Sequence, residues 1–188
     1  MDGASAVERH KNCDVVVVGG GFAGLYQVHR LHQAGYRVRA FEKAPDVGGT
    51  WYWNRYPGAR CDIDSITYSY SFDPELEREW RWPHRYAAQP DILRYIEHVA
   101  DRFDLRRHFT FDTTVEAAYY DEDARRWQVR TSGGEELSTQ FLIMATGCLS
   151  KPLELNFKGF EQYRGRHYYT NRWPHEGVDF SGQRVGVI

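Results

Sequence analysis

The feature that most constrains this chain is a change of hydrophobic period across a run of glycines near its start. Residues 13–18 are, apart from Asp14, an apolar and largely β-branched run, typical of a strand buried on both faces of a parallel sheet. Glycines occupy 19–21, and apolar residues then recur at helical spacing over 22–33. In residues 36–41 apolar and polar side chains alternate, and this stretch closes on the acidic residue Glu42. The pattern predicts a βαβ unit.

The glycines of this unit have the spacing that a bound dinucleotide requires. Gly19 permits a tight turn, Gly21 lets a pyrophosphate approach the backbone, and Gly24 lets helix and strand pack closely. The helix N-terminus offers free N–H groups to the phosphates, and Glu42 can accept hydrogen bonds from ribose hydroxyls. An acid at this position disfavours NADP here but suits either NAD or FAD, and a purely structural glycine turn is the alternative.

The remaining sequence predicts further elements of an α/β fold. The glycine- and aromatic-rich stretch 45–64 indicates an ordered loop, and 90–103 has the period of an amphipathic helix. Asp73 followed by proline and glutamate indicates a helix start. Short alternating segments over 109–143 predict an antiparallel meander, and 141–145 repeats the buried-strand pattern.

The domain organisation follows from these elements. We expect a flexible lead at 1–12, a first domain at 13–152, an irregular aromatic-rich linker at 153–182, and a further apolar strand at 183–188. A buried strand that ends a chain would have nothing to cover it, so we expect these residues to be a fragment of a longer protein.

Composition narrows the class of protein. The chain is 41% hydrophobic and has a formal net charge of -2, which excludes a disordered chain and argues against bulk nucleic-acid binding. Three cysteines without CxxC spacing fit neither a disulfide framework nor a zinc site, so we expect a reducing, cytoplasmic compartment. No apolar run is long enough for a membrane span, and the histidines lack metal-ligand spacing, so we expect no membrane association and no metal.

The loop 48–62 carries a more specific pattern. It reads, in order, a small residue, glycine, any residue, tryptophan, four residues, an aromatic, proline, glycine, three residues and aspartate. With the Ala-Thr-Gly at 145–147, this sequence resembles the type I Baeyer–Villiger monooxygenases, flavoproteins with two dinucleotide-binding folds. A packed aromatic cluster without cofactor contact is the alternative reading of the loop.

The resemblance implies functional roles for individual residues. It makes 13–152 an FAD-binding domain of Rossmann type and 183–188 the first strand of an NADP-binding fold, and it places Asp62 beside both cofactors as a catalytic residue. NADP would contact Arg60, Cys61 and Asp62. FAD would contact Gly19, Gly21, Phe22, Ala23, Gly24, Glu42, Lys43, Gly49, Thr50, Trp51, Trp53, Asp62, Tyr68, Val115, Ala145 and Gly147. By pattern alone, Tyr68 and Val115 are equally consistent with simple core positions.

A second signature of the family, F-x-G-x-x-x-H-x-x-x-W-P, aligns with residues 163–174. Tyr163 replaces the phenylalanine, and Tyr169 replaces the histidine, which removes an imidazole that exchanges protons near neutral pH. The family links this histidine to communication between its two cofactor domains. His167 lies two residues earlier and would share a strand face with Tyr169, so it is a candidate substitute.

The resemblance also implies a reaction. FAD reduced by NADPH takes up dioxygen to form a flavin C4a-peroxide, which attacks a ketone and yields an ester or lactone. The partners would be a small-molecule ketone, dioxygen, and the missing NADP-binding and remaining FAD-domain segments. We expect the 188 residues alone to be inactive. The alternatives are a non-catalytic FAD-binding fragment and an N- or S-oxygenating relative.

Overall fold

The computed structural model describes residues 12–188, so the predicted lead lies almost wholly outside the described residues. The sheet contains six strands in the order β3-β2-β1-β6-β5-β4. They are β1 (Asn12–Val18), β2 (Val38–Phe41), β3 (Phe109–Thr110), β4 (Val115–Asp121), β5 (Arg126–Thr131) and β6 (Glu136–Met144). The α-helices are α2 (Phe22–Gln33), α3 (Thr50–Trp53), α4 (Pro74–Glu79) and α5 (Gln89–Arg102), and the 3-10 turns are η1 (Arg106–His108), η2 (Phe160–Gln162) and η3 (Thr170–Arg172).

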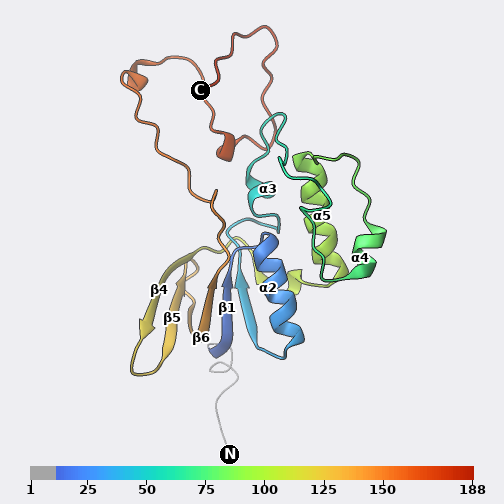
Figure 1. Cartoon of the computed structure of the whole chain (residues 1–188). Coiled ribbons are helices and arrows are strands. Elements are labelled where there is room, and N and C mark those ends of the chain that lie inside the picture. The colour runs from blue at the N-terminus through green and yellow to red at the C-terminus, as the bar shows by residue number, and fades with distance from the viewer. Residues whose placement is uncertain (1–11) are drawn as a thin grey trace, which may run out of the picture.

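The predicted βαβ unit forms at the centre of the sheet. Strand β1 runs parallel to β2 on one side and to β6 on the other, and Val18 is in register with both Phe41 and Met144. Helix α2 spans the residues predicted for it and packs beside these strands (Figure 1). The three parallel strands therefore end at one edge, the edge at which open α/β sheets bind ligands.

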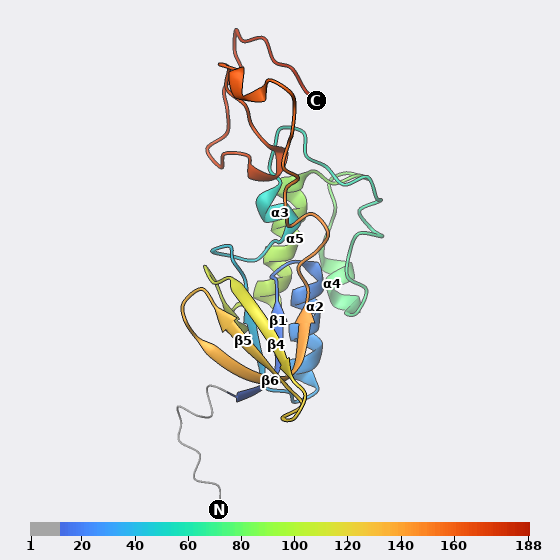
Figure 2. The same ribbon diagram turned by 90° about the vertical axis from the view of Figure 1, so that its left-hand side faces the viewer.

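The two faces of β1 pack against different layers. Val15 and Val17 join Leu25 of α2 and Ile92 of α5 in the main core, because alternate residues of a strand face opposite sides. Val16, which points the other way, packs with Val129 and Leu137 of the meander, and Cys13 at the start of β1 belongs to the same cluster. The helices thus cover one face, while β4 and β5 curl away at the far end of the sheet (Figures 1 and 2).

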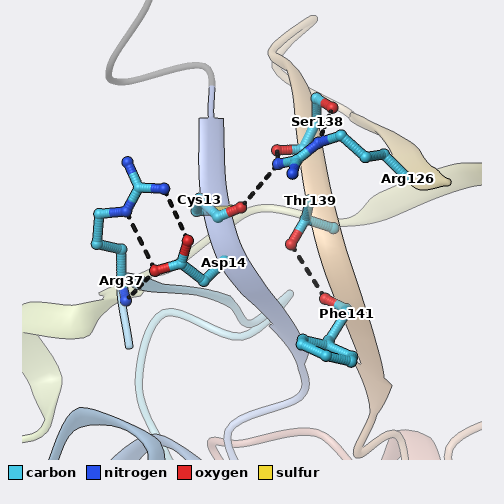
Figure 3. A network of polar contacts seen from close by, with 7 residues as sticks. All are labelled: Cys13, Asp14, Arg37, Arg126, Ser138, Thr139 and Phe141. Carbon is cyan, nitrogen blue, oxygen red and sulfur yellow. Dashed lines mark hydrogen bonds and ion pairs between the residues drawn. The ribbon is translucent and has the colours of Figure 1, made fainter. Parts of the chain in front are cut away.

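Polar side chains tie the meander to the parallel strands (Figure 3). Arg126 of β5 donates from Nη2 to the carbonyl oxygens of Cys13, at 3.1 Å, and Ser138, at 3.0 Å. On the other side of β1, Asp14 accepts 2.7 and 3.1 Å hydrogen bonds from the Arg37 guanidinium and holds the start of β2. These contacts fix the base of the sheet, opposite the edge where the parallel strands end.

Two parts of the chain differ from the sequence expectations. The antiparallel meander forms as β4, β5 and β6, but β6 is a single strand whose last residues are less buried than predicted, and Phe141 is 48% exposed. The predicted strand at 183–188 does not form: these residues are exposed and irregular. A strand needs a hydrogen-bonding neighbour, and none of the strands formed by residues 12–188 pairs with this segment.

Other sequence expectations concern membranes, metals and cysteines. None of the helices in the described part of the chain has the length and apolar composition that a bilayer crossing requires. Within residues 12–188 no three metal-ligating side chains gather at one point. All three cysteines are free thiols, Cys13 and Cys61 buried and Cys148 exposed.

Helix α2 carries a buried histidine that makes stability depend on pH. His29 lies 4.7 Å, between ring centroids, from both Phe72 and Phe103, and burial, aided by Arg30, lowers its pKa. As the pH is lowered, His29 is therefore protonated in the unfolded chain before it is protonated in the folded chain. Its contribution to the free energy of unfolding is complete above about pH 6.5 and is lost as the pH drops towards the folded-state pKa. We predict that His29→Leu weakens this dependence in urea unfolding between about pH 5 and 8, whereas His167→Leu in the exposed tail leaves it unchanged.

Candidate functional site

A cavity of about 620 Å³ opens at the edge where β1, β2 and β6 end. Its walls come from the glycine turn after β1, the first residues of α2, the loop around α3, and the residues that follow β6. Its volume falls in the range of cofactor and small-molecule sites. The topology of the sheet therefore places a ligand-sized space at the predicted dinucleotide site.

Two of the glycines are needed for packing. Gly19 has φ +111, and a Cβ built there would lie 2.4 Å from the Ala145 carbonyl oxygen at the end of β6. A Cβ built on Gly24 would lie 1.8 Å from the Gly19 carbonyl oxygen. Gly24 does not line the cavity. It acts by letting α2 cross close to the turn, which is the packing role predicted for it.

The other glycines shape the space itself. Gly21 is the N-cap of α2 with extended backbone and no side-chain cap, and Phe22 and Ala23 of the first turn line the cavity. Gly49, from the loop before α3, has φ +53, and a Cβ on it would lie 2.7 Å from the Gly21 Cα. The first turn of α2 contains no acidic side chain that would occupy its free N–H groups. These N–H groups and the positive end of the helix dipole are therefore available to a ligand in the cavity.

Glu42 holds the glycine turn and the end of β2 together. Its Oε2 accepts a 2.6 Å hydrogen bond from the Gly20 N–H, and its Oε1 accepts one of 2.8 Å from the Ala44 N–H. The side chain is buried yet lines the cavity. A carboxylate has about four acceptor sites, so two remain for ribose hydroxyls. The predicted sugar-binding role is compatible with the structural role found here.

Aromatic side chains form another wall of the cavity. The Trp51 indole Nε1 donates a 3.1 Å hydrogen bond to the Tyr68 hydroxyl, and Lys43 Nζ lies 4.9 Å from the centroid of the Trp53 ring. Burial raises the pKa of Tyr68 despite its hydrogen bond from Trp51, with smaller contributions from Cys61, Cys148 and Asp62. Flat, water-excluding walls of this kind suit a planar aromatic ligand.

The residues predicted to contact NADP lie outside this cavity. Asp62 is exposed and does not line the cavity. Arg60 is exposed and donates to the Tyr86 carbonyl oxygen. The Cys61 side chain is buried in the main core, and its N–H donates to the Ala87 carbonyl oxygen. The part that these three residues play towards NADP stays a prediction.

Most of the predicted FAD residues meet at the cavity. Only Gly24 and Asp62 do not line it; those that do are Gly19, Gly21, Phe22, Ala23, Glu42, Lys43, Gly49, Thr50, Trp51, Trp53, Tyr68, Val115, Ala145 and Gly147. Sequence reasoning missed several other lining residues, among them Asn54, Thr113, Thr114, Lys151, Asn171 and Arg172. The two threonines directly precede Val115, but no local pattern marks Asn171 or Arg172, which reach the cavity from a distant segment.

The side chains that line the cavity carry a positive balance. Lys43, Lys151 and Arg172 contribute three cations against the single carboxylate of Glu42. Lys43 Nζ also donates a 3.4 Å hydrogen bond to the Ser150 carbonyl oxygen, which links the end of β2 to the segment after β6. A positive site with free backbone N–H groups favours an anionic ligand such as a diphosphate. Volume, charge, glycine cradle and aromatic wall together fit FAD.

Comparison with known proteins agrees with this geometry. The family model described as pyridine nucleotide-disulphide oxidoreductase matches residues 16–188. The chain belongs to this family. A Baeyer-Villiger monooxygenase of Pseudooceanicola batsensis is 50% identical over 93% of the chain and 32% of the relative. The solved structure of a steroid monooxygenase bound to NADP is 59% identical, with a TM-score of 0.85, over 91% of this chain and 33% of that one.

The predicted resemblance to Baeyer–Villiger monooxygenases is thereby confirmed, and with it the Rossmann-type fold. A relative with another activity in its name, the phenazine N-monooxygenase PhzNO1 of Lysobacter antibioticus, is 43% identical over 93% of the chain and 32% of the relative. The chain spans about a third of the length of the curated relatives it matches.

The two roles of glycine give a prediction with an internal control. A Cβ on Gly21 would meet the Gly49 Cα at an ordinary 3.4 Å, so Gly21→Ala should fold normally and place its methyl at the cavity wall. Gly24→Ala should fail to fold, because its methyl would overlap the Gly19 carbonyl. Circular dichroism and FAD titration separate the two variants. Gly21→Ala with unchanged FAD affinity would contradict the placement of the phosphates.

The double hydrogen bond to Glu42 gives a second prediction. In Glu42→Gln the amide nitrogen cannot accept, so either the Gly20 or the Ala44 N–H loses its partner. A buried donor left unpaired costs about 1–3 kcal/mol. We expect a lower thermal midpoint in differential scanning calorimetry, while Glu116→Gln, on the exposed part of β4, serves as the control. Equal midpoints for the two variants would show that Glu42 does not hold the turn.

Proposed function

We propose that this chain forms the FAD site of an FAD- and NADPH-dependent Baeyer–Villiger monooxygenase, which converts a ketone to an ester or lactone with dioxygen. The observation that carries the proposal is the cavity at the βαβ edge, which gathers nearly all the predicted FAD residues around a glycine cradle. The names of relatives that match the chain support the same assignment.

Each wall of the cavity has a task in this function. The N–H groups at the start of α2 bind the diphosphate, and Glu42 orients the adjoining ribose. Trp51 and Tyr68 position the planar ring and exclude water. When bound, FAD supplies the chemistry that accepts electrons from NADPH and passes one oxygen atom of dioxygen to the substrate. Lys43, Lys151 and Arg172 stabilise negative charge at the site.

The proposal extends to the second cofactor and the substrate. Arg60, Cys61 and Asp62 would form the NADP-facing side, and their place outside the FAD cavity, with Arg60 and Asp62 exposed, supports this. Residues 13–152 would be the FAD domain, 153–182 the linker, and 183–188 the start of the NADP domain. The substrate is a small-molecule ketone, and the compartment is the cytoplasm.

N-oxygenation is the second candidate function. It is favoured by the phenazine N-monooxygenase among the relatives, because that protein matches the same share of the chain as the Baeyer–Villiger relative. The FAD site would serve both reactions alike. The reacting atom of the substrate distinguishes them: an electrophilic ketone carbonyl carbon in one, a nucleophilic ring nitrogen in the other.

A chimera tests the proposal. In the chimera, this chain takes the place of the matching segment of the steroid monooxygenase to which it is 59% identical. The purified chimera is then examined for bound flavin. We expect bound FAD and NADPH consumption that rises when a ketone is added, with ester or lactone formed. The same chimera carrying Gly21→Ala is the matched control and should hold less FAD.

The outcomes separate the candidates. Oxidation of phenazine but of no ketone would transfer the assignment to N-oxygenation. A folded chimera that holds no FAD would overturn both candidates, because each depends on the same cavity.

A further inference from the structure

The segment 65–72, here called the tyrosine segment, links two walls of the cavity. Its two tyrosines reach towards different elements. Tyr68 accepts a hydrogen bond from Trp51 of α3, and Tyr70 donates from its hydroxyl to the Phe22 carbonyl oxygen of α2 at 2.6 Å. Tyr68 lines the cavity whereas Tyr70 does not, so Tyr70 acts from behind the wall.

Tyr70 is held firmly in this place. Its own N–H donates a 2.9 Å hydrogen bond to the Tyr95 hydroxyl of α5. Its ring packs 5.1 Å from that of Phe22 and 5.2 Å from that of Phe72, between centroids. Burial raises the pKa of Tyr70, so the hydroxyl keeps its proton and remains a donor at any working pH. The donor is therefore permanent and fixed in direction.

The acceptor of this hydrogen bond belongs to a peptide group with a second task. The carbonyl of Phe22 and the N–H of Ala23 are two ends of one planar peptide unit. Ala23 lies in the first turn of α2, where N–H groups have no partner within the helix, and it lines the cavity. A hydrogen bond to the carbonyl orients this unit and polarises it, which makes the N–H a stronger donor.

We infer that Tyr70 is a positioning residue that aims and strengthens the Ala23 N–H towards the diphosphate of the bound dinucleotide. The inference rests on the proposed FAD site. Tyr70 reaches the cofactor only through the Phe22–Ala23 peptide, and the tyrosine segment thereby couples the phosphate end of the cavity to its aromatic end.

The variant Tyr70→Phe removes the hydroxyl and keeps the ring. Tyr26→Phe is a matched control, since Tyr26 lies on α2, as Ala23 does, and its ring lies 6.4 Å from that of Tyr70, but the residue is 36% exposed. In ¹⁵N-labelled, ligand-free protein, we expect the Ala23 amide proton to move upfield in Tyr70→Phe and to stay in place in Tyr26→Phe. This readout needs no cofactor.

Binding is the second readout. Tyr70 acts on the ligand only through the Ala23 N–H, so its loss costs a part of what one ordinary hydrogen bond contributes, about a two- to threefold change in affinity. We expect the dissociation constants of both FAD and ADP to rise by that factor in Tyr70→Phe, because the two share the diphosphate, and to remain unchanged in Tyr26→Phe.

The results distinguish failure of the inference from failure of the proposed function. An unmoved Ala23 amide, or an unchanged FAD affinity beside a lower thermal midpoint, would overturn the inference and leave Tyr70 a structural residue. A wild-type chain that binds neither FAD nor ADP would overturn the proposed function, whatever the Ala23 amide does.

Discussion

The rest of the site depends on the contact between Gly24 of α2 and the Gly19 carbonyl at the end of β1. No side chain fits there, since a Cβ on Gly24 would approach the carbonyl oxygen to 1.8 Å. This close crossing brings the start of α2 to the edge of the sheet, where its free N–H groups face the cavity. The loop before α3 is drawn in as well, because the Gly48 N–H donates a 2.9 Å hydrogen bond to the Gly20 carbonyl oxygen.

The walls of the cavity are joined by hydrogen bonds that cross between elements. Glu42 fastens the glycine turn to β2, Lys43 reaches the segment after β6, and the tyrosine segment connects α2 with α3. Each connection uses a side chain that also lines the cavity or lies directly behind it. The same groups that stabilise the fold therefore set the shape of the binding site. A substitution at one of them should change both the stability of the fold and the affinity for the ligand.

The local parts of this arrangement are predictable from sequence. Helix α2 spans the residues predicted from its periodicity, because glycines bound it at 19–21 and at Gly35. Arg172 and Asn171 were not predicted, because the fold of a distant segment brings them to the cavity and no local pattern records that. Residues 183–188 have the composition of a strand without a neighbour to pair with. Composition indicates what a segment can form, but pairing decides what it does form.

The central claim is that the cavity at the βαβ edge holds FAD through its diphosphate. Its most direct test is an equilibrium titration of the purified chain with FAD, followed by flavin fluorescence, with ADP added as a competitor. The account predicts saturable binding at one site and displacement of FAD by ADP. Binding that fails to saturate, or that ADP leaves untouched, would contradict it.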